Sequence, residues 1–292
     1  MSRVYEALRQ SELERGATAP LLDPDSFLCE AVPTQQPVAL AEQSVAWDQI
    51  ASVHPRMRED SRVVSLSDDK SLGAEKFRLL RARLRHLREK QQLRRIVITS
   101  AVPNEGKTLV SMNLAVTLAK HSNEKVLLLE GDLRKPMVAE HMGLQGRPGL
   151  DDWIAGDQPV CNFLYHIDDL PLYLMPAGAP RDNPLAILQS ARFLQLYQEL
   201  SNAFDWILID APPLLPMADV TFWSRQADGL LLVAREGRTP RKILQKGLEV
   251  LDTPKLIGVV LNEAHAVERS YYYHYYNASK QHPQKVGQSC HE

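Results

Sequence analysis

Short, strongly apolar runs alternate with longer amphipathic stretches over the last two thirds of the chain. Six runs are apolar at nearly every position: 95–100, 125–130, 170–175, 206–211, 229–235 and 255–262. Strands that are apolar on both faces are typical of a parallel sheet buried between helices. Crossover helices of suitable length and periodicity are predicted between them, at 107–121, 186–202 and 240–252. The pattern predicts an α/β fold with a doubly wound, mostly parallel sheet over residues 66–265.

A further helix is predicted from Ser71, because apolar residues recur there at helical spacing, at Phe77, Leu80, Leu84 and Leu87. One position after each of them stands an arginine: Arg78, Arg81, Arg85 and Arg88. Such an arginine stripe is commonly a solvated basic face. Four guanidinium groups on one line also suit a partner surface that carries carboxylates. The pattern leaves both interpretations open.

The first 65 residues lack sustained periodicity. The pattern over residues 1–15 predicts at most a short helix. This segment is either disordered or a docking helix for a partner. Residues 16–65 are interpreted as a linker because of the prolines they contain: Pro20, Pro24, Pro33, Pro37 and Pro55.

The composition of the 292 residues narrows the function classes. An apolar fraction of 44% is ample for a globular core, and a formal charge of −2 predicts no general attraction to nucleic acid. The three cysteines are far apart and have no metal-ligand spacing, which fits a reducing compartment. No run of about 18 apolar residues occurs. We therefore expect a cytoplasmic protein without a nucleic-acid partner.

A phosphate loop is predicted where the run 95–100 leads into a helix. Gly106, Lys107 and Thr108 stand at this junction. Backbone N–H groups at a helix start bind phosphate, the lysine neutralises phosphate charge and the threonine hydroxyl binds Mg²⁺. The candidate nucleotide-binding residues are Pro103, Asn104, Glu105, Gly106, Lys107, Thr108 and Leu109.

This loop is a variant of the Walker A pattern. Ala101 stands where the first glycine of the standard pattern falls, and Pro103 stiffens the turn. Partitioning and septum-site ATPases carry an additional signature lysine in this loop, whereas this chain has Val102 before PNEGKT. The loop therefore disfavours a partitioning ATPase.

Three carboxylates follow apolar strands of the predicted sheet. Glu130 and Asp132 are two residues apart at the end of one strand, so that an extended backbone points both side chains toward one site. Asp210 closes the run WILID and suits a carboxylate that holds Mg²⁺. The alternative for Asp132 is a helix N-cap. Together with the phosphate loop, these residues predict a site for ATP and Mg²⁺, with Thr108, Asp132 and Asp210 as the metal-binding group.

The C-terminal segment collects five of the nine tyrosines within six positions: Tyr271, Tyr272, Tyr273, Tyr275 and Tyr276. The residues alone allow core, interface or substrate roles for them. We expect a flexible tail over residues 266–292.

Residues 71–280 resemble the bacterial tyrosine autokinases (BY-kinases) of polysaccharide biosynthesis, in the stretches VPNEGKT, EGDLRKP, ILIDAPPLLPMAD, VAREGRTPR and the tyrosine run. The resemblance implies a P-loop NTPase fold and an ATP-dependent protein-tyrosine kinase that phosphorylates its own tyrosine cluster in trans. It makes Lys107, Glu130, Asp132 and Asp210 the candidate catalytic residues. Glu130 would accept the tyrosine proton, although the family has Asp at this position.

The same resemblance assigns further residues. Glu75, Arg78 and Arg81 match the family's Glu-x-x-Arg-x-x-Arg helix, which implies subunit contacts in a ring-like homo-oligomer such as an octamer. Asn262 falls where related nucleotide-binding proteins hydrogen-bond adenine, and an asparagine there is equally suited to a turn.

The family also implies partners: a separate membrane-bound polysaccharide co-polymerase that activates the kinase and holds it at the inner membrane, and a tyrosine phosphatase. Two alternatives remain at this point. One is a partitioning or septum-type P-loop ATPase, and the other is a pseudo-kinase adaptor in which Glu130 has removed phosphoryl transfer. The residues do not identify the polysaccharide.

Overall fold

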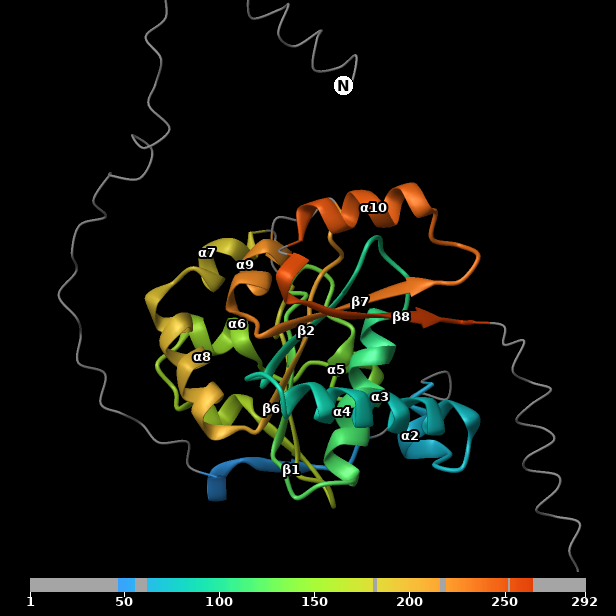
Figure 1. The fold of residues 1–292 in the computed structure, drawn as a ribbon. Coiled ribbons are helices and arrows are strands. Elements are labelled where there is room, and N and C mark those ends of the chain that lie inside the picture. The colour runs from blue at the N-terminus through green and yellow to red at the C-terminus, as the bar shows by residue number, and fades with distance from the viewer. Residues whose placement is uncertain (1–46, 56–61, 181–182, 216–218, 252, 265–292) are drawn as a thin grey trace, which may run out of the picture. The chain divides into compact units, whose positions relative to one another are not determined.

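An eight-stranded sheet with helices on both faces forms the fold (Figure 1). The computed structural model describes residues 47–55, 62–180, 183–215, 219–251 and 253–264. The predicted docking helix, most of the predicted linker and the tyrosine cluster lie outside these residues.

The strands stand in the order β1-β4-β5-β3-β6-β2-β7-β8. Neighbouring strands are parallel except for the antiparallel pair β4 and β5. In chain order they are β1 (Ala51–Val53), β2 (Arg95–Ser100), β3 (Val126–Glu130), β4 (Tyr165–Ile167), β5 (Leu172–Met175), β6 (Trp206–Asp210), β7 (Gly229–Arg235) and β8 (Leu256–Asn262). All six predicted strands are present, and the mostly parallel α/β architecture is confirmed.

Two layers of helices cover the sheet. The described helices are α2 (Val64–Ser67), α3 (Leu72–Arg88), α4 (Lys107–Lys120), α5 (Val138–His141), α6 (Leu150–Ala155), α7 (Pro184–Leu188), α8 (Ala191–Ala203), α9 (Asp219–Gln226) and α10 (Arg241–Val250). Short 3₁₀ turns lie at η2 (Trp47–Gln49), η3 (Val160–Phe163) and η4 (Thr253–Lys255). Helix α3 starts as predicted, because the Ser71 hydroxyl caps it by accepting a hydrogen bond from the Ala74 N–H at 3.1 Å.

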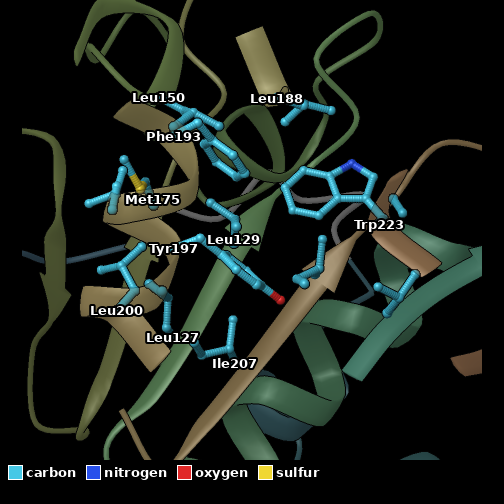
Figure 2. Packing of buried hydrophobic residues seen from close by; sticks show 14 of the residues in the cluster. Leu127, Leu129, Leu150, Met175, Leu188, Phe193, Tyr197, Leu200, Ile207 and Trp223 are labelled. Carbon is cyan, nitrogen blue, oxygen red and sulfur yellow. The ribbon is translucent and has the colours of Figure 1, made fainter. Parts of the chain in front are cut away.

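The buried side chains divide into two cores, one on each face of the sheet. Strand β3 supplies both, because Leu127 and Leu129 pack into one core while Val126 and Leu128 pack into the other. Figure 2 shows the first core, in which Phe193, Tyr197 and Leu200 of α8 lie near the side chains of β3. This alternation explains why the strands are apolar throughout: each face needs its own apolar row.

The predicted helix 186–202 is wrong as a single element, because it is two helices, α7 and α8. Ser190 separates them. Its hydroxyl accepts a hydrogen bond from the Phe193 N–H at 3.1 Å and donates one to the Ile187 carbonyl at 2.7 Å. A serine that caps the following helix competes with continuation of the preceding one.

The fold also begins earlier than predicted, so residues 47–55 and 62–65 of the predicted linker belong to the sheet domain. Trp47 packs edge-on against Tyr173 and Phe204 at centroid distances of 5.4 and 5.3 Å. Strand β1 then pairs with β4, and Val63 is fully buried. Three-residue strands such as β1 and β4 are too short to show periodicity, which is why the pattern missed both.

Candidate functional site

The predicted phosphate loop joins β2 to α4 and is built for an anion. Gly106 precedes the helix with φ of 93°, and Asn104 has φ of 65°. No side chain of the described residues caps α4. The first N–H groups of a helix have no acceptor within the helix, and its N-terminus carries partial positive charge. The loop therefore presents unpaired donors where a phosphate would bind.

Lys107 lies between two carboxylates at the carboxyl ends of β3 and β6. Its Nζ is 2.9 Å from Oδ2 of Asp132 and 3.5 Å from Oδ2 of Asp210, and only 12% of its side chain is exposed. Thr108 donates to Asp210 Oδ2 at 2.7 Å. The structure thus brings together Lys107, Thr108, Asp132 and Asp210, which the sequence predicted as one site. This is the crevice at strand ends where open α/β sheets bind ligands.

Ser111 is a site residue that the sequence analysis missed. Its hydroxyl lies 3.1 Å from Asp210 Oδ1, at hydrogen-bond distance. The signal was available, because Ser111 follows Lys107 by four residues and therefore lies on the same face of α4.

The electrostatics of this group favour a bound cation. Burial raises the pKa of Asp210, and the nearby Asp132 raises it further, against the opposing effect of Lys107. For Lys107, burial lowers the pKa, but Asp210 and Asp132 outweigh that effect and hold it above its ordinary value. Two carboxylates around one ammonium group leave negative charge that a second cation would offset.

Glu130 does not join the Lys107 group. Its carboxylate is fully buried and accepts hydrogen bonds from the N–H groups of Val138 and Ala139 at the start of α5, and from Ala177 N–H at 2.9 Å. Burial raises its pKa to about 7, although these hydrogen bonds oppose the shift. Glu130 and Asp132 have different partners, because Glu130 accepts backbone N–H groups whereas Asp132 contacts Lys107. Glu130 is nevertheless a register partner of Asp210, which also raises the Glu130 pKa.

A cavity of about 500 Å³ lies beside Glu130. Its lining includes three acidic residues, one arginine and several prolines: Glu130, Glu140, Asp152, Arg147, Pro136, Pro148, Pro176 and Pro180. This combination of carboxylates, a guanidinium group and apolar rings suits an amphipathic side chain.

Two of the motifs in the sequence meet at an ion pair. Arg134 of EGDLRKP donates through Nε to Asp219 Oδ2 at 2.7 Å, and Asp219 closes the stretch ILIDAPPLLPMAD. This bridge ties the segment after β3 to the start of α9. The sequence analysis did not assign either residue.

Asn262 lies against the phosphate loop. Its Nδ2 donates to the Glu105 carbonyl at 2.9 Å, so the side chain that was predicted to contact adenine is engaged with the loop backbone in this structure.

The arginine stripe of α3 is largely engaged within its own chain. Arg78 pairs with Glu75 and lies 3.4 Å from Asp69, and Arg81 donates to the His121 carbonyl at 2.6 Å. Further along, the guanidinium group of Arg88 pairs with Glu124 at 3.1 Å and stacks 4.4 Å from the ring centroid of Trp206. Arg78, Arg81 and Arg88 therefore make intrachain contacts while they remain only partly buried.

The donor set suits a nucleotide with Mg²⁺. The hydroxyl and carboxylate oxygens of Thr108, Asp132 and Asp210 are the hard ligands that Mg²⁺ prefers. Nowhere in the described ranges do three or more His, Cys, Asp or Glu side chains gather into a group that could hold a metal ion by itself. At phosphates, Mg²⁺ usually takes only one or two carboxylates from the protein.

No helix among the described residues is long and apolar enough to span a membrane.

Comparison with known proteins decides the family. No protein-family model matches the chain. The tyrosine-protein kinase YwqD of Bacillus subtilis is 31% identical over 220 residues, which cover 75% of this chain and 92% of YwqD. The chain is a bacterial tyrosine-protein kinase. The predicted family is thereby confirmed, and the partitioning-ATPase alternative is set aside.

Other relatives of this tyrosine kinase extend the comparison. The succinoglycan biosynthesis transport protein ExoP of Rhizobium meliloti is 31% identical over 225 residues, which cover 75% of the kinase and 28% of ExoP. Among solved structures, the chimerical protein CapA2B2 superposes with a TM-score of 0.65 at 27% identity and covers 74% of the kinase and 93% of CapA2B2. The cell division ATPase MinD of Pyrococcus furiosus superposes with a TM-score of 0.50 at 28% identity, over 59% of the kinase and 73% of MinD. The kinase therefore has the P-loop NTPase fold, and its neighbours imply that it binds a nucleotide.

Proposed function

We propose that this kinase transfers a phosphoryl group from ATP, in the presence of Mg²⁺, to the tyrosines at 271–276 of another copy of the chain. The observation that carries the proposal is the convergence of Lys107, Thr108, Asp132 and Asp210 at the start of α4. Phosphoryl transfer requires mainly positioning and charge neutralisation, and this group supplies both.

Each residue of the group has a distinct role. Lys107 and the first N–H groups of α4 would hold the phosphates, and Thr108, Asp132 and Asp210 would hold Mg²⁺. Bound there, Mg²⁺ would neutralise charge on the phosphoryl oxygens. Ser111 would keep Asp210 oriented through its hydrogen bond at 3.1 Å.

Glu130 is our candidate for the group that accepts the tyrosine proton. A tyrosine hydroxyl has an ordinary pKa of about 10 and is mostly protonated at neutral pH, so transfer benefits from a nearby base. The pKa of Glu130 is about 7, which suits a general base. The adjoining cavity of about 500 Å³ is large enough for a phenol ring. We therefore assign this cavity to the acceptor tyrosine.

The biological setting proposed here is polysaccharide synthesis or export. The name of ExoP places that relative in succinoglycan biosynthesis and transport. By analogy, the kinase would regulate such a pathway from the cytoplasmic side of the inner membrane, where a separate membrane-bound co-polymerase activates it. A tyrosine phosphatase would reverse the modification, because each phosphotyrosine adds a charge of about −1.5 to −2 that persists until hydrolysis.

Incubating the purified chain with ATP and Mg²⁺ tests the activity on the tail. We expect phosphotyrosine in the wild type, mapped by mass spectrometry to residues 271–276, and its loss when all five tyrosines are changed to Phe. Phosphate that stays at wild-type level in the five-Phe variant would place the acceptor elsewhere.

The proposal includes a ring-like homo-oligomer that uses Glu75, Arg78 and Arg81. The double substitution Arg78→Ala and Arg81→Ala should shift the protein to smaller species in size-exclusion chromatography with light scattering, while nucleotide binding is retained. The matched control is Arg83→Ala on the same helix, because Arg83 is exposed. Since Arg81 also bonds to the His121 carbonyl, thermal unfolding must show that the double variant is folded. An unchanged oligomer in a folded double variant would contradict this interface.

A further inference from the structure

Asn262 closes β8, and both ends of its side-chain amide are engaged. Its Nδ2 donates to the carbonyl of Glu105 in the phosphate loop at 2.9 Å. Its Oδ1 accepts from the N–H of Glu263 at 3.0 Å. An asparagine amide has two N–H donors and one oxygen acceptor, and here one N–H and the oxygen are each directed at backbone. One N–H of Asn262 therefore fixes the backbone of the loop at Glu105.

The neighbouring Gly106 makes room for this contact. A Cβ added at Gly106 would lie 2.1 Å from Nδ2 of Asn262, which is too close for two non-bonded heavy atoms. Gly106 also has φ of 93°, a conformation that strains residues with a side chain. The glycine thus serves both the turn and the approach of Asn262.

A second tether holds the same loop residue through its side chain. The Glu105 carboxylate is buried, accepts from the Val102 N–H at 3.2 Å, and accepts from the hydroxyl of Thr239. The Thr239 hydroxyl in turn accepts from the Arg235 N–H at 2.8 Å. Glu105 is therefore fixed from the segment that follows β7 as well as from β8.

These two anchors lie at the same end of the paired strands β7 and β8. Arg235 and Asn262 are register partners on the paired strands β7 and β8, and the Arg235 guanidinium group also lies 3.4 Å from the Asn104 carbonyl. Asn104 has φ of 65°, which is uncommon for a residue with a side chain and persists only where the surroundings determine it. The ends of β7 and β8 supply those surroundings.

We propose that Asn262 is a positioning residue that holds the phosphate loop in its binding conformation, rather than a residue that reads the adenine base. This inference rests on the proposed nucleotide site. A positioning role and adenine recognition predict different effects of Asn262 on the affinity for different ligands. A residue that shapes the loop affects every ligand with a triphosphate, whereas a residue that reads the base affects only adenine nucleotides.

Binding measurements on Asn262→Ala with three Mg²⁺-bound probes separate these roles: ATP, GTP and inorganic tripolyphosphate. Loss of one net hydrogen bond corresponds to roughly a 3- to 10-fold loss of affinity. We expect the affinity for all three probes to fall by the same factor. A loss confined to ATP would overturn the proposal in favour of adenine recognition.

Thr239→Val provides a second, nearly isosteric variant, because it removes only the hydroxyl that binds Glu105. We expect the same uniform loss for the three probes. In addition, amide hydrogen exchange of residues 102–106 should be faster in both variants than in the wild type without nucleotide. Unchanged exchange in both variants would overturn the proposal, whether or not the wild type binds nucleotide. Failure of the wild type to bind any of the three probes would instead contradict the proposed function.

Discussion

Replacement of Lys107 by Met should abolish both ATP hydrolysis and tyrosine phosphorylation, with a loss of about 10³-fold or more. Lys107 is the only cation that contacts Asp132 and Asp210 among the described residues. Without it, phosphate groups would face two carboxylates and no ammonium group. Loss of a single neutral donor at a transition state already costs about 10²- to 10³-fold, and loss of a full charge should reach at least the upper end. Phosphotyrosine formation and phosphate release are the measurements.

Two controls make this result specific. Lys246→Met changes a lysine that is exposed on α10 and should leave both activities intact. Lys107→Arg retains the positive charge but replaces a compact ammonium group with a planar guanidinium group. We expect Lys107→Arg to be folded and inactive, because position matters as well as charge. Near-normal phosphotyrosine in Lys107→Met would contradict the assignment of the phosphate loop.

Asp210→Asn should reduce tyrosine phosphorylation by about 100-fold or more, because it removes the carboxylate that Lys107, Thr108 and Ser111 all contact. The same variant should unfold at a temperature at least as high as the wild type without nucleotide. Burial raises the pKa of Asp210, so its ionised form opposes folding at neutral pH, and the wild type gains stability from this group as pH falls. Removing the charge removes that cost.

Asp228→Asn is the matched control, and we expect it to have the opposite effects on activity and on stability. Burial acts to raise the pKa of Asp228, but hydrogen bonds from the Arg95 side chain and from the N–H groups of Arg94 and Arg95 outweigh it and hold the pKa below its usual value. Its ionised form therefore stabilises the fold above the ordinary carboxyl pKa, and this stability is lost in acid as pH falls toward the lowered value. Asp228→Asn should retain activity and lose about 1–2 kcal/mol of unfolding free energy at neutral pH. Strong destabilisation by Asp210→Asn would contradict the view that Asp210 is held for function.

The sequence predicted the sheet and the phosphate site well for a physical reason. Buried parallel strands must be apolar on both faces, so β2, β3, β5, β6, β7 and β8 are all visible as apolar runs. Lys107, Asp132 and Asp210 converge because the loop after β2, the segment after β3 and the end of β6 all lie at the carboxyl edge of the parallel sheet.

The features that the sequence did not predict depend on contacts that the periodicity of apolar residues does not encode. Strand β1 is held by pairing with β4, and Trp47 nearby packs on rings that are distant in sequence. The direction of the Glu130 side chain is set by N–H groups of Val138 and Ala177, which lie 8 and 47 residues away. The engagement of Asn262 with Glu105 spans 157 residues. Such partners become visible only when the chain is folded.

The central claim is that the tyrosines at 271–276 are substrates delivered by one copy to another. The most direct measurement mixes a Lys107→Met chain that has an intact tail with an active chain whose five tail tyrosines are Phe. After incubation with ATP and Mg²⁺, the two chains are separated by an affinity tag and their phosphotyrosine is measured. Our account predicts phosphate on the Lys107→Met chain, and none at residues 271–276 of its partner. An active partner that leaves the Lys107→Met chain unphosphorylated, while wild type alone phosphorylates its own tail, would contradict transfer between copies.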